Sequence, residues 1–385
     1  MNRFVHRKRK SILFMMAALA LVVSFTSGAI LLHGGATKAY AFGSGVASSL
    51  AALSASSSQP NFGSNVYIFN PSMSQSTIQA TVDAVASQQV SNQFGTQRYA
   101  LLFEPGTYGS KTDPLNFQVG YYTTVAGLGL SPNDVVINGS IYVRNQCDSS
   151  GSCTALNNFW RSLSNLTINV TTPNFGCYSG EFWAVSQAAP MRRVHINGLT
   201  TLMDYCTAPS FASGGFIADT EFNGSTVING SQQQWLVRNS KLDGWTNGVW
   251  NQVFSGVVGA PAQCFPAQPN VCGPYTTLAT NPVTREAPYL YVDARRHYKI
   301  FVPKVQRNSV GTTWGGGSVA GSSISIEDDF FVAKPTDSVQ KINSALAQGH
   351  NLLFTPGHLL PGPHNQGQAP RHGCAGLGFP DARAE

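Results

Sequence analysis

The chain alternates short apolar runs with turn residues over most of its length, and residues 225–259 show this pattern best. There, apolar runs of about 3–6 residues are separated by Asn-Gly, Asn-Ser and Asp-Gly pairs, which form tight turns at low cost. The stretch lacks the apolar period of a helix. Short strands recurring about every 16–28 residues are typical of stacked solenoid coils rather than of a sandwich. We therefore predict an all-β chain folded as a parallel β-helix.

A strand, a helix and two further strands are predicted to open this solenoid. Residues 65–69 form the first strand, and residues 76–89 (STIQATVDAVASQQ) form the clearest helix. Its apolar side chains fall on one face, and Ser74 or Ser76 would cap its N-terminus. Residues 98–108 (RYALLFEPGTY) then predict a buried strand, a Pro-Gly turn and the start of the next strand.

The same order of elements begins again later in the chain. Residues 338–348 (SVQKINSALAQ) match the first helix, and NLLFTPG at 351–357 matches ALLFEPG at 100–106. Gly-Leu-Gly follows at a similar distance in both places, at 127–129 and at 376–378. Because helix, strand, turn and Gly-Leu-Gly match in order, we interpret the repeat as a second opening of the same kind of domain.

This repeat places the domain boundaries. We expect one parallel β-helix domain over 61–330 and the start of a second β-helix over 331–385. Residues 358–385 hold Pro, His, Gly and Arg without strand alternation, and a coil without inward apolar residues cannot stack. We expect an incomplete second domain with an irregular tail, from a truncated or frame-shifted gene. The alternative is a disordered tail on a one-domain protein.

The stretch between the two openings is expected to supply the remaining coils. Strands are predicted at 135–143, 158–170, 191–198, 202–206 and 215–222. The Pro-rich residues 260–288 predict a long loop, residues 289–302 predict two strands joined around 293–296, and residues 311–317 form a glycine-rich link.

The N-terminus has the features of an export signal. Residues 1–41 combine a basic start, an apolar segment and the small-x-small sequence Ala39-Tyr40-Ala41. We expect cleavage there, a flexible Ser/Ala/Gly-rich linker over 42–60, and a secreted protein whose only membrane contact is transient. An uncleaved membrane anchor is the alternative, because the apolar stretch approaches the roughly 20 residues that span a bilayer.

The basic net charge carries no information about partners. Six of the 24 Lys and Arg residues and none of the 18 Asp and Glu residues lie in 1–41, so the remainder is balanced. We expect no nucleic-acid partner.

Seven cysteines in an exported chain predict disulfides. Cys147 with Cys153 and Cys264 with Cys272 are close pairs that would staple loops. Cys177 and Cys206 are candidates to join neighbouring coils, and Cys374 is left over. No Cys/His cluster has zinc spacing, so we expect no metal site and no cofactor.

Three acidic residues are the catalytic candidates: Asp219, Glu221 and Asp204. Asp219 and Glu221 are separated by one residue, so on a single strand they point the same way, as acid/base chemistry or a calcium site requires. Asp204 lies in an apolar segment and is expected to be partly buried. For each, a turn or a solvated outer face is the alternative.

The duplicated helix–LLFxPG–GLG opening, together with QQWLVRN at 233–239, resembles glycoside hydrolase family 55. This family comprises β-1,3-glucanases built from two right-handed, pectate-lyase-like parallel β-helices. The resemblance implies that Gln233 and Gln234 bind water or sugar. It also implies that three tryptophans line the site: Trp235, Trp245 and Trp250. The general-acid Glu would belong to the second helix.

The resemblance implies a carbohydrate-active protein that acts on a β-glucan-like polysaccharide, and we expect it to be secreted and monomeric. Truncation would leave its enzymatic competence open. Two alternatives remain. One is a polysaccharide lyase on the same fold, for which Arg192, Arg193 and Arg238 are suitable. The other is a non-catalytic glycan-binding or cell-surface protein.

Overall fold

The structure is a computed structural model. It describes residues 59–171, 176–230, 233–246, 251–265, 273–316 and 319–358, and the backbone of 374–376. The predicted signal segment and most of the linker lie outside these residues. No helix in the described part of the chain is long and apolar enough to cross a membrane.

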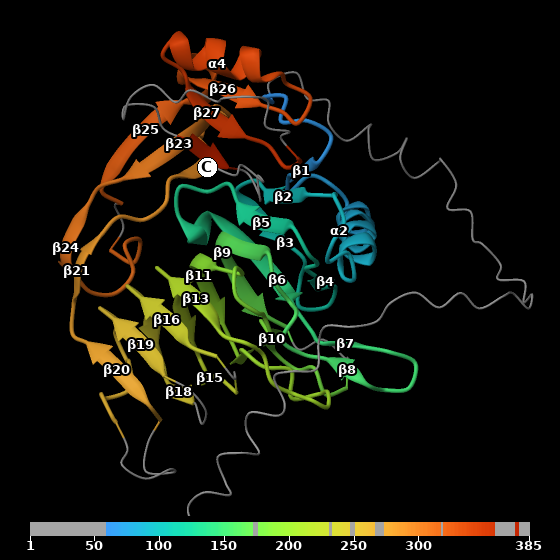
Figure 1. Ribbon diagram of the computed structural model, residues 1–385, viewed down its shortest axis with the longest axis vertical. Helices are drawn as coiled ribbons and strands as arrows, with labels where there is room; N and C mark the ends of the chain where they lie inside the picture. The colour runs from blue at the N-terminus through green and yellow to red at the C-terminus, as the bar shows by residue number, and fades with distance from the viewer. Residues whose placement is uncertain are drawn as a thin grey trace, which may run out of the picture. The chain divides into compact units, whose positions relative to one another are not determined.

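A long parallel sheet forms the first wall of a β-helix (Figure 1). Successive strands pair in parallel because each coil lies directly on the previous one. In order they are β1 (Val66–Phe69), β2 (Tyr99–Phe103), β5 (Thr123–Gly127), β9 (Arg161–Val170), β11 (Met191–Asn197), β13 (Gly215–Ala218), β16 (Trp235–Arg238), β19 (Gln252–Ser255) and β20 (Tyr275–Leu278). The predicted parallel β-helix is confirmed.

Two further walls complete each coil. The second contains the C-terminal parts of β9 and β11 with β3 (Gly106–Tyr108), β4 (Leu115–Gln118), β6 (Val135–Tyr142), β14 (Glu221–Asn223) and β17 (Lys241–Leu242). The third contains β10 (Glu181–Phe182), β12 (Thr200–Thr201), β15 (Val227–Ile228) and β18 (Trp245–Thr246). The strand expected at 202–206 is wrong: β12 ends at Thr201, and residues 202–206 form bends and a turn.

Four residues with a left-handed backbone conformation form a column at the corner between the first and second walls. Asn165, Arg193, Asp219 and Asn239 follow one another on successive coils with φ of 55°, 55°, 54° and 45°. Asn and Asp tolerate this conformation better than most residues do. The corner at Asp219 ends β13, and Glu221 begins β14, so the expectation that Asp219 and Glu221 share one strand and one face is wrong.

Helix α2 (Gln75–Gln89) packs against the first coils with Ile78, Val82 and Val85 buried in the main core. Ser74 caps it by accepting a hydrogen bond from the Thr77 N–H. The remaining short elements are the 3₁₀ turn η2 (Pro132–Asp134) and the hairpin of β7 (Gln146–Cys147) and β8 (Cys153–Thr154).

After β20 the chain leaves the solenoid as antiparallel strands. They are β21 (Asn281–Thr284) with β24 (Gln306–Ser309), and β22 (Tyr289–Val292), β23 (Tyr298–Pro303) and β25 (Gly321–Ser325). The two strands expected within 289–302 are confirmed. The loop expected over 260–288 is wrong in part, because β20 continues the parallel stack on β19 and β21 follows it.

The final segment repeats the opening in register. It contains α3 (Ile326–Asp329), β26 (Phe330–Ala333), α4 (Val339–Ala347), β27 (Asn351–Phe354) and β28 (Cys374–Gly376). Phe354 pairs with Gly376 as Phe103 pairs with Gly127. Gly357, at φ 152°, abuts Pro335 as Gly106, at φ 148°, abuts Pro71. The irregular tail therefore contains at least one strand.

Two predicted disulfides are present, Cys147–Cys153 and Cys177–Cys206. Cys264 is also disulfide-bonded, and its expected partner, Cys272, lies outside the described residues.

Candidate functional site

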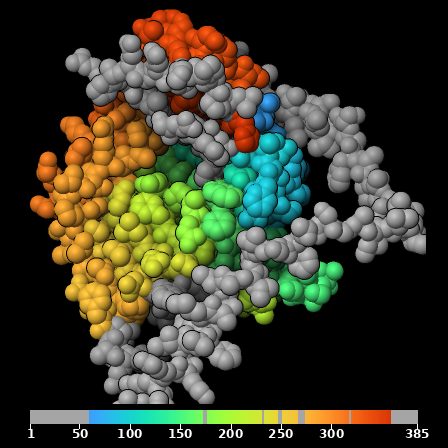
Figure 2. Space-filling model, viewed as in Figure 1, coloured from blue at the N-terminus to red at the C-terminus, as the bar shows by residue number. Residues whose placement is uncertain are grey.

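A cleft of about 310 Å³ lies on the outer face of the main sheet, where it crosses β5, β9 and β11. Residues 286–289, which lead into β22, form its opposite wall. A smaller cavity of about 100 Å³ adjoins it and shares Thr124, Ser164, Asn165, Pro288 and Tyr289. In Figure 2 the surface is recessed between the orange segment and the green coils.

Hydroxyl groups form the floor of this cleft. Thr124 on β5 and Ser162 and Ser164 on β9 point outward because side chains alternate between the two faces of a strand. The Ser162 hydroxyl donates to Thr124 Oγ1 at 3.0 Å. Ser164 has no side-chain hydrogen bond within the described residues, so its hydroxyl is available to a ligand.

Arg192 and Glu286 line one side of the cleft, and Arg238, which is not part of the lining, is the ion-pair partner of Glu286. Arg238 Nη2 donates to Glu286 Oε2 at 3.0 Å, and Arg238 Nη1 donates to Oε1 of the same carboxylate. Arg192 lies 3.8 Å from Glu286 Oε2, and both guanidinium groups lie over the Phe216 ring. Among the described residues that line the cleft, Glu286 carries the only carboxylate.

Arg193 connects residues 286–289, the opposite wall of the cleft, to the corner between the first and second walls of the solenoid. Its guanidinium donates to Asp219 Oδ2 at 3.0 Å, to Thr313 Oγ1 at 3.1 Å and to the Tyr289 hydroxyl at 3.2 Å. Burial raises the pKa of Tyr289 to about 12, although the nearby Arg193 charge opposes the shift. Arg193 therefore fixes the position of Tyr289, which lines both cavities.

Asp219 and Glu221 do not form a catalytic pair in this arrangement. Asp219 is fully buried and accepts hydrogen bonds from Arg193, from the Thr313 hydroxyl at 2.7 Å and from the Thr313 N–H. Burial raises its pKa to about 6, with Arg193 opposing. Glu221 instead accepts from Lys241 Nζ at 2.7 Å. Neither residue lines the cleft.

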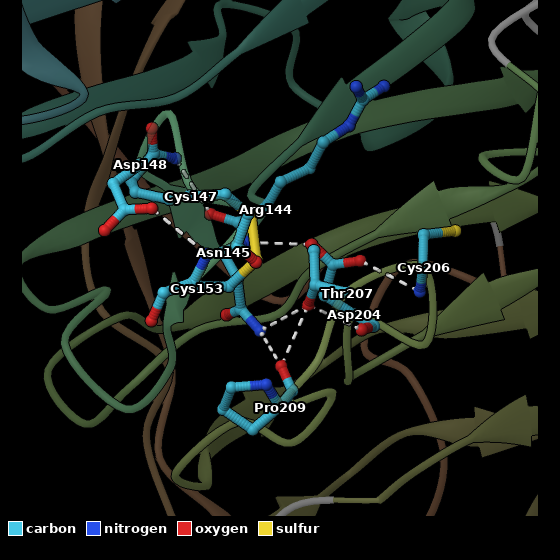
Figure 3. The surroundings of a disulfide bond; sticks show 12 residues. Arg144, Asn145, Cys147, Asp148, Cys153, Asp204, Cys206, Thr207 and Pro209 are labelled. Atoms are coloured by element: carbon cyan, nitrogen blue, oxygen red, sulfur yellow. Dashed lines mark hydrogen bonds between the residues drawn. A yellow bond between two sulfur atoms is a disulfide. The ribbon is translucent and has the colours of Figure 1, made fainter.

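Asp204 does not line the cleft, and Figure 3 shows it beside Asn145 and Cys206 in the surroundings of a disulfide. Its carboxylate accepts from the Asn145 N–H at 2.9 Å, from the Cys206 N–H at 3.2 Å and from the Tyr178 hydroxyl at 3.2 Å. It is buried, as expected, and burial raises its pKa. Asp204 thus holds together the loops that the two disulfides also staple.

Two of the three tryptophans predicted to line the site lie in the core. Trp235 is 0% exposed and Trp245 is 9% exposed, and their rings meet edge to face at 6.5 Å inside the solenoid. They are inward residues of β16 and β18, so the assignment to a sugar site is wrong for both. Gln233 and Gln234 are exposed just before β16 and do not line the cleft. Trp250 lies outside the described residues.

The cleft residues that sequence reasoning missed have weak individual signals. Ser162 and Ser164 alternate with Leu163 in a strand, which marks them as outward residues but not as ligands. Glu286 lies in the Pro-rich segment that was predicted to be a loop. Its role becomes visible only through its contact with Arg238, 48 positions earlier in the chain.

Comparison with known proteins agrees with this architecture. The family model described as rhamnogalacturonase A/epimerase, pectate lyase-like, matches residues 103–261. An exo-beta-1,3-glucanase from Streptomyces sp. (strain SirexAA-E / ActE) is 48% identical over 300 residues, covering 77% of this chain and 45% of the relative.

Two solved structures of sacteLam55A from Streptomyces sp. SirexAA-E are also similar, each at 46% identity over 78% of this chain and 50% of that one. The TM-scores are 0.68 for one structure and 0.66 for a variant in complex with glucose. This chain spans about half the length of the relatives it matches. The resemblance of this chain to the β-1,3-glucanase-like, pectate-lyase-like β-helix proteins of glycoside hydrolase family 55 is therefore confirmed.

Proposed function

We propose that this chain provides the glycan-binding half of an exported β-1,3-glucan hydrolase. The observation that carries the proposal is the cleft over β5, β9 and β11, with its floor of hydroxyl groups and its wall of ion-paired arginine and glutamate side chains. Such groups donate and accept hydrogen bonds in the alternation that sugar hydroxyls require. The similarity to an exo-beta-1,3-glucanase supports a β-1,3-glucan as the ligand.

The chemistry of the cleft suits binding and water placement better than acid catalysis. Inverting hydrolysis needs a carboxylic acid at the leaving oxygen and a held water on the opposite face of the sugar. Thr124, Ser162 and Ser164 are suited to hold the water and the sugar hydroxyls. Glu286 is engaged by Arg238 and does not offer a free carboxyl group. We propose that the general acid comes from outside the described lining of this cleft.

Residues 1–41 support the proposal of export, and a monomer remains our proposed oligomeric state. A non-catalytic glycan-binding protein is the second candidate, because the described residues that line the cleft include no carboxyl group besides the ion-paired Glu286.

The test is binding and hydrolysis of laminarin by the wild type and by a Ser162→Ala/Ser164→Ala variant. Ser322→Ala, at an exposed position on β25, is the matched control. We expect the double variant to bind laminarin about 10-fold more weakly, since two hydrogen bonds to the ligand are lost, while Ser322→Ala binds normally. Reducing-sugar release separates the two candidates: turnover supports the hydrolase, and binding without turnover supports the binding protein. Unchanged binding by the double variant would remove this cleft as the glycan site.

A further inference from the structure

Arg192 differs from the other arginines around the cleft in how it is partnered. Its side chain is 33% exposed and lines the cleft. In the part of the chain that the structure describes, no group accepts a hydrogen bond from it: its contacts are the Glu286 carboxylate at 3.8 Å and the Phe216 ring at 4.5 Å. We propose that the cleft holds a subsite for the carboxylate of an acidic sugar residue, with the Arg192 guanidinium as its ligand. This inference rests on the proposed function, because it takes the ligand to be a glycan.

Among the described residues in and next to the cleft lining, the arginine side chains outnumber their carboxylate partners by one. Asp219 balances Arg193 at 3.0 Å, and Glu286 balances Arg238 through two hydrogen bonds. Arg192 approaches only Glu286 Oε2, the oxygen that already accepts from Arg238 Nη2. Among the described residues, these three guanidinium groups therefore share two carboxylates, and the incompletely compensated group, Arg192, lines the cleft.

The Arg192 side chain is held ready for a planar anion. The Arg192 guanidinium carbon lies 4.5 Å from the centre of the Phe216 ring, and a planar guanidinium can present two N–H groups to one carboxylate. Burial lowers the pKa of Arg192, Glu286 opposes this shift and Arg238 adds to it. An anion in the cleft would offset the cost of that burial.

The register of the sheet places sugar-binding groups beside this anchor. Arg192 pairs with Ser164 on the neighbouring strand, and adjacent strands lie about 4.8 Å apart. A sugar whose carboxylate met Arg192 would have its ring hydroxyls over Ser164 and Ser162. This continuity from a cation to a row of hydroxyls fits a carboxylated sugar better than a free inorganic anion.

The experiment compares two disaccharides that differ in charge. Laminaribiose and a glucuronic acid–glucose disaccharide are titrated into the full chain by calorimetry in 50 mM and in 500 mM NaCl, between which the Debye length falls roughly threefold. We expect the acidic sugar to bind about 10-fold tighter at low salt, as one charge-assisted bidentate pair provides. High salt should reduce that preference.

Three variants locate the effect. Arg192→Gln is expected to lose the preference, so that the acidic sugar and laminaribiose bind it with equal affinity. Arg192→Lys, which keeps the charge but lacks the planar fork, should retain a weaker, salt-sensitive preference, and it decides the question if Arg192→Gln does not fold. Arg307→Gln, at an exposed position on β24 outside the cleft lining, removes the same charge and should leave the preference unchanged.

Each result that would overturn the proposed subsite has a different meaning. Equal affinity of the wild type for both sugars, or a preference that survives in Arg192→Gln, overturns the subsite and leaves the glucan proposal standing. Loss of the preference in Arg307→Gln overturns it as an effect of net charge. Competition by phosphate beyond that of chloride at equal ionic strength would show a simple anion site instead. Failure of both sugars to bind overturns the subsite and the proposed function together.

Discussion

Arg193 and Asp219 form a buried ion pair of 3.0 Å between two successive coils, and both residues adopt left-handed backbone conformations. The pair also reaches outside the solenoid: Arg193 binds Tyr289, and Asp219 binds Thr313 and, through its carbonyl, the Trp314 indole N–H. One corner of the β-helix therefore binds both Tyr289, in the wall of the cleft, and residues 313–314 further along the chain.

Replacing Asp219 should destabilise the fold strongly. Asp219→Asn leaves the buried Arg193 without its counter-ion, which costs about 3–5 kcal/mol when one partner of a buried pair is removed. Urea unfolding measures this cost. Glu221→Gln is the matched control: its partner Lys241 is 44% exposed, so the loss should stay below about 1 kcal/mol. Equal losses in the two variants would contradict the structural role of Asp219.

The sequence pattern predicted the coils well because local rules determine them. The helix at α2, its Ser74 cap and the strand-turn-strand around Phe103 and Gly106 follow from apolar spacing and turn residues alone. The repeat at β26–β28 was visible for the same reason, since it reproduces those residues in order.

The cleft was not predictable in the same way. Trp235 resembles a sugar platform in the sequence, and only its register beside Gly215 shows that it points into the core. Asp219 and Glu221 appear to share a face until the corner between them is known. Glu286 and Arg238 meet because a segment outside the solenoid returns to it, and no short-range pattern encodes that return.

Glu181 should make stability depend on pH. Burial raises its pKa to about 8, although hydrogen bonds from Ser140 and the Ile141 N–H oppose the shift. The fold favours the protonated acid, so its contribution is complete below the unfolded-state pKa of about 4.5 and is lost as the pH rises through about 8. Wild-type unfolding free energy should fall between pH 5 and pH 8.5 by roughly a few kcal/mol more than that of Glu181→Gln. Parallel pH profiles for the two proteins would exclude this origin.

Trp235 should matter for stability and not for sugar binding. Trp235→Ala removes a fully buried ring that packs against Trp245, and such truncations cost about 3–5 kcal/mol. Laminarin affinity, measured well below the melting temperature of the variant, should stay within about twofold of wild type, because the ring does not line the cleft. A large loss of affinity in a variant that remains folded would restore the sequence-based assignment.

Glu104 should dock the β22–β23 hairpin onto the opening coils. The carboxylate is 0% exposed and accepts from Arg296 at 2.7 and 2.9 Å and from the Tyr298 hydroxyl at 3.1 Å. Glu104→Gln removes the charge and one acceptor, so Arg296 loses its bidentate partner and the turn at 293–297 should open more often. Limited trypsin digestion should then cleave after Arg295 or Arg296 several-fold faster than in wild type.

A second substitution separates docking from general loss of stability. The repeated opening has Thr355 where the first has Glu104, and among the described residues the Thr355 hydroxyl bonds only to the Ala333 carbonyl of the same repeat. Thr355→Val should therefore leave cleavage at 293–297 unchanged. Faster cleavage in Thr355→Val, or no acceleration in Glu104→Gln, would mean that the hairpin is held by its apolar contacts with Leu102 and Leu128 rather than by the buried carboxylate.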